Sequence, residues 1–222
     1  MAAEAKRYAV LLICGRGLPA EALRVESSGR ESESRRHPVE EPVLIQIQTG
    51  DRQLLGGIAA ALAEAARRSG EWLVCRPGCH ECCLGSFPIS ALDALRLRAG
   101  LAALELVDRA RAAAIRARAE AYQESSDDVP CPALDPETGH CCLYESRPIA
   151  CRAFGPATRI GEGAVGACEL CYAGADDEEI ARCAVEIDPD GLEEKLVAAL
   201  EAEGISGTTI VAHALLAGPA TP

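Results

Sequence analysis

Four cysteines lie close together in one short segment of the chain, with the spacing Cys75-x3-Cys79-x2-Cys82-Cys83. Two cysteines separated by two or three residues can both face one metal ion without strain, which is why zinc sites and iron-sulfur loops use such pairs. More thiols follow along the chain, and they are Cys131, Cys141, Cys142, Cys151, Cys168, Cys171 and Cys183. One folded core could gather them all, so the pattern predicts a thiolate metal centre.

The pairs Cys79-x2-Cys82 and Cys168-x2-Cys171 could together supply a four-thiolate site, which is ordinary zinc or iron-sulfur chemistry. The other cysteines leave enough ligands for a second site or for a larger cluster. We favour an iron-sulfur cluster over zinc because the cysteines outnumber the ligands of one tetrahedral zinc ion and histidines are few. Structural zinc can also be bound by thiolates alone, so both cofactors stay open.

Some of the potential ligands are expected to be spectators. Cys14 is isolated, and a free cysteine often behaves as a small buried apolar residue. Neighbouring side chains tend to diverge, so not every member of the pairs Cys82-Cys83 and Cys141-Cys142 is expected to bind the same atom. The chain has four histidines. His80 and His140 adjoin cysteines and are secondary candidates for metal ligands. His37 and His213 are expected to be structural or exposed.

Composition limits the class of protein and its partners. With 222 residues, of which 49% are apolar and 25% charged, the chain can bury a core without disulfide staples. The net charge of -12 opposes binding to a nucleic-acid backbone. No apolar stretch approaches the roughly 20 residues of a membrane span, and the apolar run at residues 8–13 is too short for a signal peptide. We therefore expect a cytoplasmic protein whose partner is a metal ion or cluster, with no nucleic acid and no membrane.

Helices are predicted to position the first cysteines. Apolar residues repeat with helical spacing from Asp51 and stop near Gly70. Ser90 and Asp93 have the spacing of a capping box, which opens the next helix. Gly100 is expected to break or kink that helix. These elements deliver the chain into the first cysteine group and carry it away again.

The rest of the chain divides into helices and loops. Helical patterns are found at residues 101–124, 177–185 and 192–203. Asp190 is expected to cap the last of these helices, Gly204 to end it, and the apolar residues 208–216 to pack on the core. Residues 127–174 are dense in Pro, Gly and Cys, so loops dominate there, and metal ligation can hold such loops. The predicted fold class is mainly α, with cysteine-rich irregular loops around a metal centre, flanked by helices.

The N-terminal part differs in composition from the rest. Residues 24–42 are polar, charged and rich in Ser, which is typical of a disordered linker. The apolar piece at residues 8–14 could be a strand, a helical turn or poorly ordered sequence. We therefore predict a poorly defined N-terminal segment over residues 1–50 and a cysteine-cluster metal-binding domain over residues 51–218.

Three ordered blocks carry a resemblance to a known family: CRPGCHECC at residues 75–83, CPAL at 131–134 and CCLYESRPIACRAF at 141–154. They resemble the YkgJ-like cysteine-cluster proteins, described as zinc- or iron-chelating domains, over roughly residues 72–183. The resemblance implies metal ligation by Cys79, Cys82, Cys83, Cys131, Cys141 and Cys151, with Cys75, Cys168, Cys171 and Cys183 as further candidates. It does not require a cysteine at Cys142. The motif residues Tyr144, Arg147, Pro148 and Arg152 suit a supporting shell, in which arginines can neutralise thiolates.

The resemblance leaves the role of the metal open between structure, metal handling and electron transfer. An enzyme is the second hypothesis, either an oxidoreductase or a protein-modifying enzyme, since flagellin lysine methylases carry a related cysteine region. A methyltransferase needs a Gly-rich strand-to-helix turn, whereas the Gly-rich residues 161–166 lack a preceding strand and are expected to be a flexible connection. No catalytic residue is assigned. A metal-free thiol redox sensor is the third hypothesis, and it predicts exposed thiols of low pKa.

Overall fold

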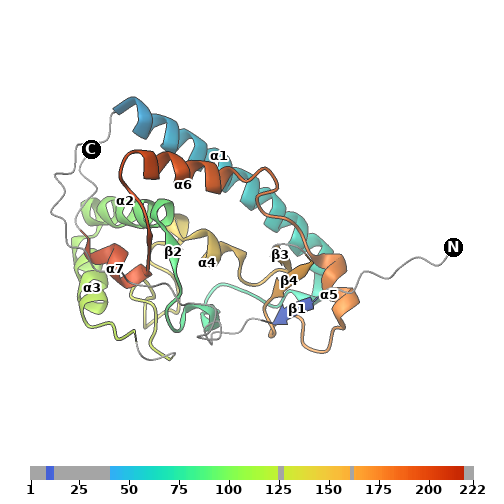
Figure 1. Cartoon of the computed structure of the whole chain (residues 1–222). Helices are drawn as coiled ribbons and strands as arrows, with labels where there is room; N and C mark the ends of the chain where they lie inside the picture. The colour runs from blue at the N-terminus through green and yellow to red at the C-terminus, as the bar shows by residue number, and fades with distance from the viewer. Residues whose placement is uncertain (1–8, 13–40, 125–127, 161–162, 218–222) are drawn as a thin grey trace.

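The computed structural model describes residues 9–12, 41–124, 128–160 and 163–217. Seven helices dominate this part of the chain, which confirms the mainly α fold class (Figure 1). They are α1 (Glu41–Ser69), α2 (Ala91–Val107), α3 (Arg109–Glu120), α4 (Ile149–Ala153), α5 (Asp177–Cys183), α6 (Leu192–Ala202) and α7 (Val211–Leu216). None of the described helices is both long enough and apolar enough to span a membrane.

The strands are short and form two small sheets. The first sheet has the order β1-β4-β3, with β1 (Ala9–Leu12) parallel to β4 (Ala164–Ala167) and β3 (Thr158–Ile160) antiparallel to it. In the second, β2 (Ile89–Ser90) pairs antiparallel with β5 (Thr208–Thr209). The apolar N-terminal piece is therefore a strand at residues 9–12, where Ala9 lies opposite Ala164.

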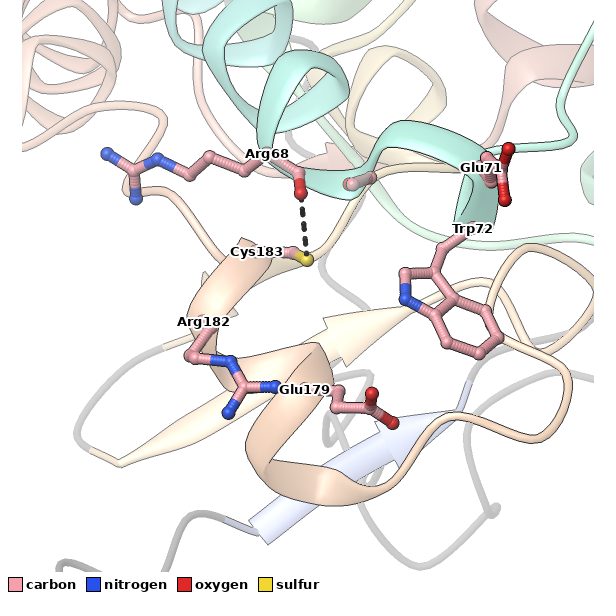
Figure 2. A pocket seen from close by; sticks show the side chains of 7 residues that line it. Arg68, Glu71, Trp72, Glu179, Arg182 and Cys183 are labelled. Carbon is pink, nitrogen blue, oxygen red and sulfur yellow. Dashed lines mark hydrogen bonds between the residues drawn. The ribbon is translucent and has the colours of Figure 1, made fainter.

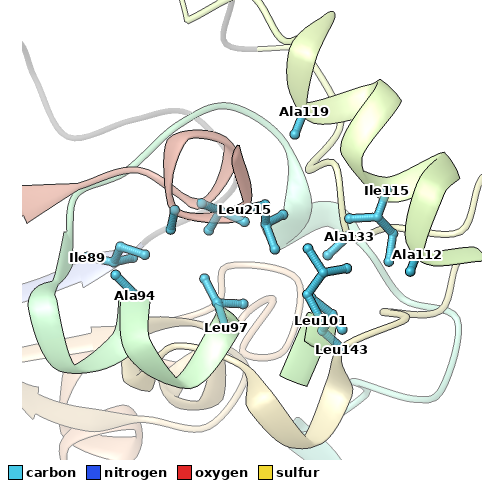
Figure 3. Packing of buried hydrophobic residues seen from close by; sticks show 12 residues of the cluster. Ile89, Ala94, Leu97, Leu101, Ala112, Ile115, Ala119, Ala133, Leu143 and Leu215 are labelled. Atoms are coloured by element: carbon cyan, nitrogen blue, oxygen red, sulfur yellow. The ribbon is translucent and has the colours of Figure 1, made fainter. Parts of the chain in front are cut away.

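Three clusters of buried apolar residues hold the helices and the first sheet. Helices α2, α3 and α7 enclose the first cluster at one end of the molecule, with Leu97, Ile115 and Leu215 at its centre (Figures 1 and 3). A second cluster lies between α1, α2 and α6. The third packs β4 against α5 and contains Cys171 and Cys183. The cysteine-rich loops run between these clusters.

Helix α1 begins at Glu41 rather than at Asp51, so the predicted division between two segments at residue 51 falls inside this helix. The reason is packing, because Ile47 is buried in the cluster that Leu54 and Ile58 also join. Residues 24–40 of the expected linker lie outside the described part of the chain.

Ser90 caps α2, since its Oγ accepts the Asp93 N–H at 3.2 Å. This is half of the predicted capping box, because the Asp93 carboxylate accepts the Ile149 N–H instead. The expected break at Gly100 is wrong, because α2 continues to Val107. The chain instead turns at Asp108, whose carboxylate accepts the Arg111 N–H at 2.9 Å and caps α3.

Gly100 permits a close approach inside α2 rather than a break. A Cβ at this position would lie 2.2 Å from Ser146 Oγ. Replacing Gly100 with alanine is therefore expected to lower the free energy of unfolding by about 1–3 kcal/mol, as overpacking does. Gly57→Ala in α1 is the matched control, because nothing lies within 4 Å of its Cβ, and it should stabilise by roughly 0.5–1 kcal/mol. Urea unfolding of both variants measures the difference, and equal effects would contradict this role for Gly100.

The C-terminal helices lie close to their predicted positions. Helix α5 opens with a capping box between Asp176 and Glu179. Helix α6 is capped by Asp188 and not by Asp190, because the Asp188 carboxylate accepts the N–H groups of Leu192 at 2.9 Å and Glu193 at 2.8 Å. The apolar residues 208–216 form β5 and α7 and pack on the core, as predicted.

The Pro-, Gly- and Cys-rich region is more regular than expected, because it contains α4 and the strands β3 and β4. The Gly-rich residues 161–166 do follow a strand, which corrects the prediction that none precedes them. That strand is the antiparallel neighbour of β4. The segment therefore joins two strands and is not a strand-to-helix turn of the kind that binds a nucleotide.

Candidate metal centre

Main-chain hydrogen bonds join three cysteine-bearing loops, of which the first comes from a distant part of the chain. The Cys131 N–H donates to the Cys83 carbonyl at 2.7 Å, and the Cys142 N–H donates to the Ala133 carbonyl at 2.8 Å. Leu134 and Cys141 form an antiparallel bridge beside the second of these bonds. The loops that carry Cys82, Cys131 and Cys141 consequently lie side by side.

Four cysteines on these loops and on α4 are neighbours. Burial raises the pKa of Cys151 well above its ordinary value, and the nearby thiols of Cys131, Cys141 and Cys82 raise it further. Burial is also the largest cause of a raised pKa for Cys141, and the Cys82 thiol contributes to this rise. Such effects weaken with distance, so these four thiols lie in the same region of the structure. We call Cys82, Cys131, Cys141 and Cys151 the first thiol group.

Cys83 stands at the edge of the first thiol group. Its thiol and the Cys82 thiol share a hydrogen bond, which is the largest cause of a raised pKa for Cys82. The main chain of Cys83 meanwhile accepts the Cys131 N–H. Of these two adjacent cysteines, it is Cys82 whose thiol also raises the pKa values of Cys141 and Cys151.

Backbone amides already point at two sulfurs of the group. The N–H groups of Ala133 and Leu134 donate to Cys131 Sγ, and the Leu143 N–H donates to Cys141 Sγ. Burial nevertheless dominates and raises the pKa of Cys131 to about 11. Such N–H groups favour a thiolate once it forms. The loops thus contain donors that stabilise thiolates when a metal displaces the thiol protons.

A buried ion network positions α4 and with it Cys151. The Ile149 N–H at the start of α4 donates to the Asp93 carboxylate at 3.0 Å. Asp93 also pairs with Arg96, and Arg96 in turn pairs with Asp51 of α1 at 2.5 Å. Only 3% of Asp93 and 8% of Arg96 are exposed. This positioning role was not predicted from the sequence, although two charged residues, three positions apart, stand here on an otherwise apolar stretch of α2.

The pKa shifts in this network follow from burial and pairing. Burial raises the pKa of Asp93 and outweighs the opposite effects of Arg96 and the Ile149 N–H. For Arg96, burial alone would lower the pKa, but the hydrogen bonds and charges of Asp51 and Asp93 raise it overall. The guanidinium therefore stays charged between two carboxylates, and the network has little access to water.

The two motif arginines have different roles. The Arg147 guanidinium lies over the Tyr144 ring, 3.5 Å from its centroid, and its positive charge acts to lower the pKa of Cys82 and Cys141. This agrees with a supporting shell that neutralises thiolates. Arg152 instead donates to the carbonyls of Arg147, at 3.1 Å, and Glu145, so it clamps the loop before α4.

The remaining closely spaced cysteines form a second set of neighbours. Burial is the largest cause of a raised pKa for Cys75, and the charges of Cys79, Cys82 and Cys168 raise this pKa further. The Cys75 thiol also shares a hydrogen bond with the Cys79 thiol. The Cys168 and Cys171 thiols share a second hydrogen bond, and the Cys75 N–H donates to Cys171 Sγ. We call Cys75, Cys79, Cys168 and Cys171 the second thiol group.

The pair Cys168-x2-Cys171 therefore lies beside Cys75, which is bonded to Cys79, whereas the spacing suggests a site of this pair with Cys79 and Cys82. A 3-10 turn at Glu81–Cys83, in which the Cys83 N–H donates to the His80 carbonyl at 2.8 Å, follows Cys79 in the chain and carries Cys82 of the first group. Cys82 raises the pKa values of both Cys75 and Cys151, so it lies where the two thiol groups approach each other.

Two other cysteines belong to neither group. The buried Cys183 thiol donates to the Arg68 carbonyl at 3.4 Å. It faces a cavity of about 740 Å³ that Trp72 and Arg182 also line (Figure 2). Cys142 lines a second cavity with Asp135 and Arg118, where burial and then Asp135 raise its pKa, and it in turn raises the pKa of the adjacent Cys141.

The histidines have contacts of other kinds. The His80 ring nitrogen Nδ1 lies 3.0 Å from the Gly78 carbonyl oxygen, and the Nε2 atom of His140 would lie 3.8 Å from a Cβ at Gly78. His213 is exposed and pairs with Glu124 at 2.7 Å, as expected of an exposed residue. Cys14 and His37 lie outside the residues that the structure describes.

The donor chemistry of both groups fits a thiophilic metal. All cysteines of the described residues are free thiols. As they stand, no three Cys, His, Asp or Glu side chains within the described ranges are arranged to hold an ion. Raised pKa values favour the protonated thiol in the first group and in Cys75 and Cys171 of the second group. A metal ion would therefore have to displace these protons before the sulfurs could bind it. The raised pKa values also oppose a thiol sensor, which needs thiols of lowered pKa.

Comparison with known proteins gives one match. Residues 74–183 match the family model CxxCxxCC, described as "Putative zinc- or iron-chelating domain". The matched segment contains both thiol groups, Cys142 and Cys183. No curated protein and no solved structure matches the chain.

Proposed function

Since the chain belongs, through residues 74–183, to the CxxCxxCC family of zinc- or iron-chelating domains, we propose that it holds a metal ion in the first thiol group as part of its fold. The main evidence for this proposal is that four buried or half-buried thiols from four separate segments are neighbours. Three of these segments are irregular loops joined by only a few main-chain bonds. An ion bound by all four would link them and add folding free energy.

We further propose that the ion is Zn²⁺. The preference for an iron-sulfur cluster was based on a surplus of cysteines over one tetrahedral zinc site. The division into two groups of four thiols removes that reason, because four thiolates suit one structural zinc ion. The amide donors to Cys131 and Cys141 and the Arg147 charge would offset the negative charge of such a centre.

A structural role agrees with where the cavities lie. An enzyme would need a pocket beside the metal. One described cavity is lined by Cys183 and Trp72, and another by Cys142 and Arg118; no thiol of the first group lines either of them. The enzyme hypothesis therefore has no support from these two cavities.

Anaerobic purification followed by elemental analysis and a visible absorption spectrum tests this function. We expect a colourless protein that contains zinc, because Zn²⁺ is d¹⁰ and has no redox chemistry. Iron and sulfide with a brown chromophore would contradict the choice of zinc and favour electron transfer. Protein that is folded but binds neither metal under reducing conditions would overturn metal binding at the first thiol group.

A further inference from the structure

We propose that the second thiol group is a separate metal site, which binds a thiophilic divalent ion such as Zn²⁺ independently of the first thiol group. Its four cysteines come from two segments that are far apart in the sequence. Cys75 and Cys79 follow α1, whereas Cys168 and Cys171 follow β4. An ion bound here would join the end of the longest helix to the first sheet.

Each pair of cysteines in this group is presented by a tight turn. The Cys171 N–H donates to the Cys168 carbonyl at 3.0 Å, and the Cys79 N–H donates to the Arg76 carbonyl at 2.9 Å. Gly78 has φ +89° directly before Cys79, a conformation that favours glycine. Turns of this kind let both cysteines of a closely spaced pair face one ion.

The two turns are also bonded to each other. The Cys75 N–H donates to Cys171 Sγ across the two segments. Such a donor stabilises a thiolate and is typical of the second shell of a metal site. Each turn has a thiol-to-thiol hydrogen bond of its own, between Cys75 and Cys79 and between Cys168 and Cys171. The four sulfurs therefore already interact before any ion is bound.

The surroundings fix the segments that carry both turns. The hydroxyl of the buried Tyr172, next to Cys171, lies 2.5 Å from Ser69 Oγ at the end of α1, and it accepts the Ala157 N–H at 2.9 Å. Gly155, with φ +108°, lies against Cys75, because a Cβ there would be in ordinary van der Waals contact with Cys75 Sγ at 3.6 Å. The chain beside both turns is thus held in place.

Exposure separates the second group from the first. Cys75 and Cys79 are exposed, whereas each thiol of the first group is at least half-buried. A chelator or an alkylating reagent should therefore reach the second group first. In a protein that carries both ions, we expect metal release in two phases, with the faster phase from the second group.

The test is the zinc content of the full-length protein after reconstitution with Zn²⁺ under reducing conditions. The wild type should bind about two equivalents, one for each four-thiolate site. A Cys168→Ala, Cys171→Ala double variant should bind about half as much zinc, and so should a Cys131→Ala, Cys141→Ala double variant. Cys183→Ala is the matched control, because Cys183 lies in the same buried cluster as Cys171 but bonds to Arg68, and it should keep the wild-type content.

The outcomes distinguish the two sites. Wild-type zinc content in the Cys168→Ala, Cys171→Ala variant would overturn the second site and leave the first. A single equivalent that disappears only in this variant would support the second site and refute the first. Alkylation of the wild type, mapped by mass spectrometry, keeps the test decisive if a variant does not fold. Zn²⁺ should protect Cys75 and Cys79 from the reagent, and unchanged labelling of both would overturn the second site.

Discussion

Replacing Cys141 with alanine is expected to remove the ion of the first thiol group and to lower the free energy of unfolding by several kcal/mol. A structural ion binds only the folded state, so its binding free energy is also folding free energy, and losing one of four thiolates sacrifices most of it. The Cys141 loop is otherwise fixed by few bonds, among them the Cys142 N–H bond to Ala133. Elemental analysis and urea unfolding under reducing conditions measure both effects.

The neighbouring Cys142→Ala variant is the matched control for Cys141→Ala. Its thiol is half-buried near Asp135 and Arg118 and also raises the pKa of the adjacent Cys141, but the family pattern does not require a cysteine at this position. We expect it to keep the wild-type metal content and to lose no more than about 1 kcal/mol of stability, as for an ordinary substitution. Equal metal loss in both variants would contradict the assignment of Cys141 rather than Cys142 to the first thiol group.

Replacing Arg96 with methionine is expected to lower the free energy of unfolding by about 3–5 kcal/mol, which is the usual effect of removing one partner of a buried ion pair. Methionine fills a similar volume but leaves the buried carboxylates of Asp51 and Asp93 without a cation. Burial already raises the pKa of Asp93, and without Arg96 its charge is destabilised further. Because Asp93 accepts the Ile149 N–H, we also expect α4 to loosen and zinc affinity at Cys151 to fall.

Arg116→Met provides the comparison for Arg96→Met. Arg116 pairs with Glu105 at 2.7 Å, but the two side chains are 37% and 39% exposed. Exposed pairs contribute at most about 1 kcal/mol, so urea unfolding should detect little change, and the zinc content should not move. A similarly small effect of Arg96→Met would show that the buried network does not hold α4.

The sequence by itself determined the residue types of the site and the local structure around it. The cysteine blocks predicted thiolate chemistry and the matched family. The cap at Ser90 and the helices α5 and α6 depend on neighbours within a few residues, so their positions could be predicted closely. Local signals failed where packing decides, as at Gly100, which lies inside α2 because Ser146 occupies the space of its missing side chain.

Only the tertiary structure decided which thiols lie together. Spacing suggested Cys79 with Cys82, but interactions between distant segments place Cys75 beside Cys168 and Cys171, and Cys82 near Cys151. The same holds for the pairing of β1 with β4 and for the bond from Ile149 to Asp93. The physical reason is that a cysteine's spacing fixes only its nearest partners along the chain, whereas burial and long-range hydrogen bonds select its partners in space.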